Sequence, residues 1–256
     1  TATVYEKGAE VIGMLKRLVG EDGYRRALDL YFDRHDGDAA TIEDWLAVFE
    51  DATGRDLSQF KRWYTQAGTP RLSVAETFED GTYTLTFKQK TPATPGQSEK
   101  KPQVIPIAVG LLNPNGDEVV PTTVLEMTEA EQSFSFEGLA AKPVPSLLRG
   151  FSAPVILERE TPTEERAFLL AHDTDPFNKW EAGRQLAKDV LSRMVTESAS
   201  PGPAYLDALR RVARDDALDP AFRALALRLP SEDDMAQTLF DAGVAPDPLA
   251  IHAARE

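Results

Sequence analysis

The sequence contains no cysteine, and this absence excludes several kinds of protein at once. Without cysteine the chain can form no disulfide framework, no thiolate zinc site and no cysteine nucleophile. The absence fits a reducing compartment, so we expect a cytoplasmic location. The sequence has no run of about 18 apolar residues and thus predicts no membrane-spanning helix. Its first residues show no basic region followed by an apolar core, so we expect no signal peptide.

Positive charge is also scarce. Lysine and arginine number 28 against 42 acidic residues, which gives a formal net charge of −14. A protein that binds nucleic acid usually carries a basic patch or stripe, and none is visible here, so we expect no nucleic-acid partner. The composition is otherwise that of a globular protein, and 256 residues suffice for one large domain or two to three small ones.

Residue types that carry chemistry are few. The three histidines, His35, His172 and His252, lie in different predicted helical regions, and the sequence contains no HExxH. A catalytic zinc site needs three protein ligands, so a site spread over these histidines and distant carboxylates remains only a weak alternative. We interpret His35 as a residue at a helix C-terminus, where positive charge is favourable. GxSxG, P-loop and GxGxxG motifs are absent as well.

Residues 1 to 69 show the apolar spacing of helices. A first helix is expected to end near Gly20, and a second is expected to stop near His35. The second helix should place four side chains on one face: Tyr24, Leu28, Tyr31 and Phe32. Thr41 is predicted to cap a third helix, with Asp44 in a capping-box position, and Gly54 to end it. A last helix should pack four side chains on one side: Leu57, Phe60, Trp63 and Tyr64.

Residues 70 to 160 show the alternation of strands instead. Tyr83, Leu85 and Phe87 alternate with threonines, and residues 79–82 give a turn signal before them. Residues 113–116 indicate another hairpin turn. Further strands are expected around 134–136 and 155–157. Several short strands with turns between them predict a small β-sandwich.

Residues 161 to 256 return to a helical pattern, punctuated by proline. Asp175, Asp219 and Asp247 each precede a proline, which places an N-cap residue before proline at the first helical position. Ser231 gives a similar start signal. Short helices at this rhythm predict stacked helix pairs, the beginning of an α-solenoid.

Four stretches, in the same order, resemble the aminopeptidase N family. They are TVYEKGA at residues 3–9, YFDRHDG with AAT at residues 31–41, FKRWYTQAGTP at residues 60–70 and QKTPATPGQ at residues 89–97. The resemblance covers at least the first 160 residues and is closest to the bacterial alanyl aminopeptidase branch. It implies that residues 1–69 are the helical tail of a thermolysin-like catalytic domain and residues 70–160 a β-sandwich domain. Residues 161–256 would then begin the C-terminal helical domain.

The resemblance also implies an activity that this chain could not perform alone. Enzymes of the family remove N-terminal residues from peptides, and an HExxH helix with a further glutamate binds their zinc. All of those ligands would lie before Thr1, so the chain is expected to be an inactive fragment of a zinc aminopeptidase that acts on peptides. We expect the intact protein to be monomeric and to favour alanine and basic N-terminal residues.

One catalytic residue of the family maps onto the chain. The tyrosine of the VYEKG segment corresponds to Tyr5, and the resemblance implies that it donates a hydrogen bond to the oxyanion of the tetrahedral intermediate. A tyrosine suits this role because its pKa near 10 keeps the phenol a neutral donor at pH 7. Glu6 and Lys7 match the same segment and are expected only to support the site. The competing hypothesis is a non-enzymatic binding or scaffold module built of the sandwich and the solenoid.

Overall fold

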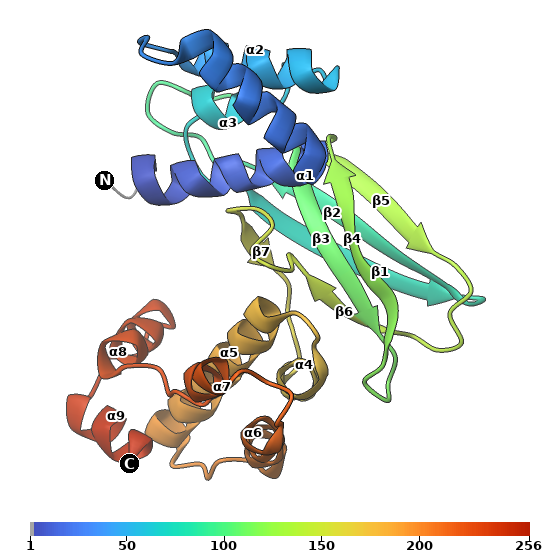
Figure 1. Ribbon diagram of the computed structural model, residues 1–256. Helices are drawn as coiled ribbons and strands as arrows, with labels where there is room; N and C mark the ends of the chain where they lie inside the picture. Colours follow the sequence, from blue (N-terminus) through green and yellow to red (C-terminus); the bar gives the residue numbers. More distant parts are fainter. Residues whose placement is uncertain (1–2) are drawn as a thin grey trace. The chain divides into compact units, whose positions relative to one another are not determined.

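The computed structural model describes residues 3–256, drawn in Figure 1. These residues group into two compact units. The first unit contains residues up to 110, residues 120–143 and residues 147–159. The second contains residues 111–119, 144–146 and 160–256. The first unit combines helices with most of two small sheets, and the second is dominated by helices. The predicted multidomain combination of helices and a small sandwich is confirmed.

The first unit begins with a short π-helical turn, η1 (Thr3–Lys7), which leads into α1 (Gly8–His35). Gly20 has φ 75° and ψ 168°, a left-handed conformation that glycine adopts without a steric penalty. The predicted interruption at Gly20 is therefore present, but no loop follows it, and the helix resumes at once after a bend (Figure 1). Its end at His35 agrees with the sequence prediction.

The next helix, α2 (Ile42–Thr53), has the predicted caps at both ends. Thr41 and Asp44 form a capping box, and Gly54 ends the helix in the left-handed conformation. The Trp45 ring packs against α2's own Phe49 at a centroid distance of 4.7 Å and against Tyr31 of α1 at 5.2 Å.

Two details of the helical prediction were wrong. Phe32 does not share the packed face of α1, because it is 60% exposed and its neighbour Tyr31 occupies that face. Successive helical residues point about 100° apart, so both cannot face the same way. The last helix is also shorter than expected. It is a single turn, α3 (Arg62–Thr65), although Leu57, Phe60 and Trp63 are buried as predicted.

The described strands form two sheets. The four-stranded sheet has the order β5 (Glu131–Phe136), β2 (Thr82–Lys90), β1 (Arg71–Glu79) and β7 (Ile156–Glu158). In this sheet β2 pairs antiparallel with both β1 and β5. The other has the order β4 (Glu118–Met127), β3 (Ile105–Leu112) and β6 (Val144–Leu147). β7 pairs in parallel with β1, which sets Ile156 opposite Arg71. The sequence did not reveal β6, because it has only four residues and one of them is a proline.

The core of the sandwich follows the alternation seen in the sequence. Tyr83, Leu85 and Phe87 on β2 are fully buried, and the polar residues between them are not. Every residue of β3 is buried, so neither face of this strand is open to solvent. A strand buried on both faces has no reason to alternate and reads as a continuous apolar run.

The second unit is built mainly of helices. They are α4 (Thr163–His172), α5 (Pro176–Glu197), α6 (Pro203–Arg214), α7 (Pro220–Ala226), α8 (Glu232–Asp241) and α9 (Pro248–Arg255). Of these, α5, α7, α8 and α9 begin where the sequence predicts. Asp175, Asp219 and Asp247 each cap a helix that starts with proline, and Ser231 caps α8 through a capping box. No helix in the described part of the chain is both long and apolar enough to cross a membrane.

The core of this unit contains one buried lysine. Leu170 of α4 packs with Leu186 and Val190 of α5 and with Val212 of α6. Lys179 of α5 is also buried and donates hydrogen bonds to the carbonyls of Leu170 and Ala171 at 3.0 and 3.1 Å. Its burial lowers the pKa of the ammonium group. The lysine therefore satisfies carbonyls that the end of α4 would otherwise leave without a helical partner.

An exposed ion pair links the last two helices of this unit. His252 Nδ1 lies 2.8 Å from a carboxylate oxygen of Glu232, and Arg255 lies 3.4 Å from the same oxygen. The hydrogen bond to Glu232 raises the pKa of His252, and the hydrogen bond from His252 lowers the pKa of Glu232. A raised histidine pKa contributes stability that is present at low pH and is lost as the pH rises through the folded value.

We therefore expect His252→Gln to change the pH dependence of stability. Wild type should exceed the variant in urea midpoint near pH 6, and the difference should shrink toward about pH 8 as His252 loses its proton. The measurement is urea unfolding followed by circular dichroism at a series of pH values. His172→Gln is the matched control, because burial lowers the pKa of His172 and predicts the opposite slope. A pH-independent difference for His252→Gln would contradict the expectation.

Candidate functional site

The candidate catalytic residue, Tyr5, lies in the π-helical turn η1 that precedes α1. Its side chain is 74% exposed, and that of the preceding Val4 is 72% exposed. The phenol makes no hydrogen bond to any of the described residues, so its donor is available to an external acceptor. π-helical turns are rare in proteins and are frequent at functional sites. The exposed Tyr5 hydroxyl can therefore donate a hydrogen bond to a group outside the described residues.

The turn is joined to the rest of the first unit by Lys7. The Lys7 ammonium donates a hydrogen bond to the carbonyl oxygen of Gly68 at 3.0 Å. The side chain is half-buried, and burial lowers its pKa. A hollow of about 450 Å³ lies beside the turn. The residues that line it are Glu6, Lys7, Glu10, Thr69, Phe151, Pro154 and Val155.

The acceptor of this hydrogen bond belongs to a tightly connected loop. Gly68 has φ 101°, and a Cβ atom at this position would approach Thr91 Cγ2 to 3.0 Å, so only glycine fits without strain. The segment before Gly68 is held to the loop around Gln97. The backbone amide of Ala67 donates to Gln97 Oε1 at 2.8 Å, and Lys100 Nζ donates to the Ala67 carbonyl at 2.9 Å. These contacts therefore restrain the position of the Gly68 carbonyl.

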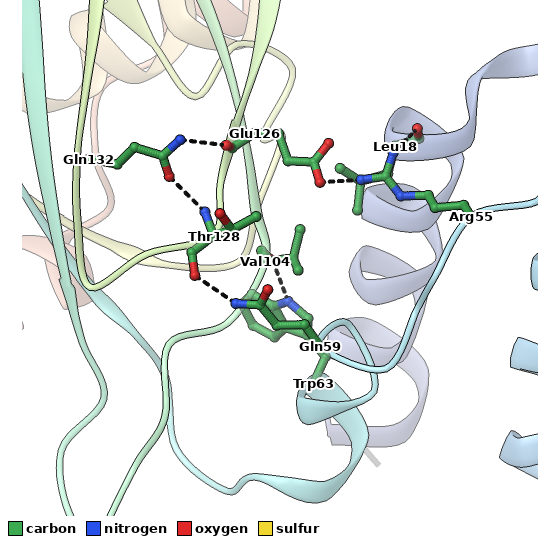
Figure 2. A network of polar contacts seen from close by, with 8 residues as sticks. All are labelled: Leu18, Arg55, Gln59, Trp63, Val104, Glu126, Thr128 and Gln132. Atoms are coloured by element: carbon green, nitrogen blue, oxygen red, sulfur yellow. Dashed lines mark hydrogen bonds and ion pairs between the residues drawn. The ribbon is translucent and has the colours of Figure 1, made fainter.

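A network of polar contacts joins the helical segment to the sandwich within the first unit (Figure 2). The Trp63 indole nitrogen donates to the Val104 carbonyl at 2.7 Å, and Gln59 Nε2 donates to the Thr128 carbonyl at 2.6 Å. Arg55 donates to the Leu18 carbonyl at 3.0 Å and also pairs with the Glu126 carboxylate. Because Arg55 bridges the Leu18 carbonyl of α1 and Glu126 of β4, these contacts hold the helix that follows Tyr5 on the sandwich.

The three histidines do not converge. His35 ends α1, as predicted, and packs against the Tyr31 ring at 5.5 Å. His172 stacks on Phe168 at 4.8 Å, and burial lowers its pKa. His252 pairs with Glu232, as described above. Over residues 3–256 no three histidine or carboxylate side chains gather into a group that could hold a metal ion. The described residues therefore do not fit a zinc ion.

Sequence reasoning did not identify the link between Lys7 and Gly68. The two residues are far apart in the sequence, and nothing in the helical or strand pattern pairs them. Each nevertheless falls inside one of the four family-like stretches, residues 3–9 and residues 60–70. That coincidence is the signal from which the contact could have been suspected.

Three family models match consecutive parts of the chain. The model of the peptidase family M1 domain matches residues 1–64. A domain of unknown function with an Ig-like fold, DUF3458, matches residues 68–160, and its C-terminal companion, described as ARM repeats, matches residues 163–256. The Ig-like description agrees with the two sheets, and the ARM repeats agree with the short stacked helices.

Curated relatives match the chain over its whole length. Aminopeptidase N of Escherichia coli is 43% identical over 271 residues, and aminopeptidase N of Caulobacter vibrioides is 47% identical over 260 residues. The resemblance to the aminopeptidase N family is confirmed. The chain spans 31% and 30% of the lengths of these two aminopeptidase N sequences. A crystal structure of Legionella pneumophila aminopeptidase A in complex with aspartic acid also matches, with a TM-score of 0.85 and 29% identity, over 100% of this chain and 29% of that one.

The network of Figure 2 generates a stability prediction. Trp63→Phe should lower the free energy of unfolding by about 2–3 kcal/mol, because it removes a buried hydrogen bond and leaves the Val104 carbonyl without its donor. Urea unfolding of the 256-residue chain measures the change. Trp180→Phe in α5 is the matched control, since this tryptophan is only partly buried, and should cost less than half as much. Equal losses in the two variants would contradict the role given to the Trp63 hydrogen bond.

Proposed function

We propose that this chain is part of a longer zinc aminopeptidase that removes N-terminal residues from peptides. In this proposal residues 1–69 end the peptidase domain, residues 70–160 form the sandwich and residues 161–256 begin the helical domain. The zinc ligands lie in the part of the longer protein that precedes these residues. In this proposal the enzyme is monomeric and cytoplasmic. The lack of cysteine favours the cytoplasmic location.

The observation that carries the proposal is the exposed tyrosine in a motif of the family. Tyr5 occupies the position of the family's oxyanion donor, and its phenol is directed out of the described unit without an internal partner. A neutral phenol can donate a hydrogen bond to the developing negative charge on the carbonyl oxygen of the scissile peptide bond. The donor contributes to the rate to the extent that it is already in place when the charge forms.

Tyr5 therefore yields a kinetic prediction for the longer protein. Tyr5→Phe removes the hydroxyl alone and should lower kcat about 100-fold or more while KM changes little, because the hydrogen bond is made mainly in the transition state. Steady-state kinetics with an alanine anilide measures both constants. Tyr31→Phe is the matched control, because this tyrosine of α1 packs against Trp45 of α2, and the variant should retain the wild-type kcat. A Tyr5→Phe variant with near-wild-type kcat would refute the assignment.

The 256-residue chain by itself should be inactive. We expect no hydrolysis of alanine or arginine anilides above the buffer rate, with or without added zinc, and no zinc retained after dialysis as measured by atomic emission. The longer protein, assayed in parallel, is the control. Stoichiometric zinc together with turnover by the 256 residues would contradict the proposal and would point to a self-contained metal site.

A binding or scaffold module remains the second candidate, favoured by the ARM-like helical repeats, which form extended surfaces in other proteins. The two candidates differ in what Tyr5 does. A scaffold would retain its function after Tyr5→Phe and would copurify with a stable partner, whereas the enzyme would lose turnover.

A further inference from the structure

We propose that Lys7 is a positioning residue that fixes the catalytic tyrosine by anchoring the turn η1 to the Gly68 carbonyl. The inference rests on the proposed function, because it assigns to Lys7 an effect that is exerted only through Tyr5. It concerns the geometry of the turn and does not require Lys7 to contact a substrate.

The Tyr5 side chain is exposed and makes few contacts within the first unit. Val4, Tyr5 and Glu6 are exposed, so packing on their side chains does not fix the turn. The turn also borders the hollow of about 450 Å³, which Thr69 and Phe151 line together with Lys7. Among the described residues, the hydrogen bond of Lys7 is thus a specific contact that ties the turn to a distant part of the first unit.

The contact made by Lys7 is of the kind that can supply this restraint. Its ammonium lies 3.0 Å from the Gly68 carbonyl, and the partners are separated by 61 residues in the chain. A half-buried ammonium group without a hydrogen-bond acceptor would be costly, so its burial favours keeping the bond made. Lys7 is also the last residue of η1, two positions after Tyr5, so a shift of its backbone is transmitted directly to the phenol.

The anchor point itself is rigid. The left-handed conformation of Gly68 and the contacts of Ala67 with Gln97 and Lys100 fix the direction of the Gly68 carbonyl. The Trp63 hydrogen bond to Val104 ties α3, which precedes Gly68 in the chain, to the residue directly before β3 (Figure 2). A displacement of a catalytic group by about 1 Å can cost about 100-fold in rate, so a restraint on this turn is a restraint on turnover.

The experiment uses the longer protein and compares Lys7→Met, Lys7→Arg and Lys7→Met combined with Tyr5→Phe. Methionine keeps most of the length and bulk of lysine but cannot donate to the Gly68 carbonyl. We expect Lys7→Met to lower kcat about 10-fold with KM within about twofold of wild type. Lys7→Arg can still donate and should recover at least half of the lost rate. Lys16→Met is the control, because this lysine pairs with Glu21 on the surface of α1 and should leave kcat unchanged.

The double variant separates the inference from the proposed function. If Lys7 acts through Tyr5, the double variant should be no slower than Tyr5→Phe alone, because the effect of Lys7 vanishes once the donor is gone. Full kcat in Lys7→Met, or losses in the two single variants that multiply, would overturn the positioning role and leave Tyr5 in place. Full kcat in Tyr5→Phe would overturn the proposed function itself. Zinc content and melting temperature, measured on each variant, should match wild type, and a lowered zinc content in Lys7→Met would overturn the role because the loss would arise at the metal.

Discussion

The hydrogen bond from the Trp63 indole to the Val104 carbonyl is the contact on which the first unit depends. It connects the last turn of the helical segment to Val104, the residue directly before β3, through a buried hydrogen bond. The contacts of Gln59 and Arg55 lie around it and make the same connection from neighbouring positions. Since α1 is held by this network, the direction in which η1 leaves α1 is determined by the sandwich as well as by the helix.

Most polar side chains described above join elements of the fold, whereas Tyr5 does not. The residues that can form hydrogen bonds or ion pairs are mostly engaged in holding elements together, as Lys179 does at the end of α4 and Glu126 does with Arg55. Tyr5 differs from them because its hydroxyl is turned outward and has no partner among the described residues. A hydroxyl that is not donated to any described residue can be donated to an external acceptor. The contrast therefore agrees with the role that the family motif suggests for Tyr5.

Local signals in the sequence predicted most of the fold. The Asp-Pro starts at Asp175, Asp219 and Asp247 and the capping box at Thr41 depend on neighbouring residues only, and all of them are present. The prediction failed where a distant partner decides the outcome. β6 exists because β3 offers it an edge, and Tyr31 rather than Phe32 is on the packed face of α1 because Trp45 of α2 lies against Tyr31. For the candidate site, the family motif suggested Tyr5, which stays a prediction, and the contact between Lys7 and Gly68 joins parts of the chain that no local pattern connects.

The parallel pairing of β7 with β1 affects how the chain can fold. Arg71, at the start of the first strand, lies opposite Ile156 in the last one, so the four-stranded sheet is incomplete until nearly the whole sandwich sequence is available. Pairings between residues so far apart close large loops and slow folding, whereas the short helices that follow form mainly from near neighbours. On a ribosome the edge of β1 would stay open while the intervening strands are synthesised. The short β7 thus completes the sheet late, and until then an unpaired strand edge is open to pairing with other chains.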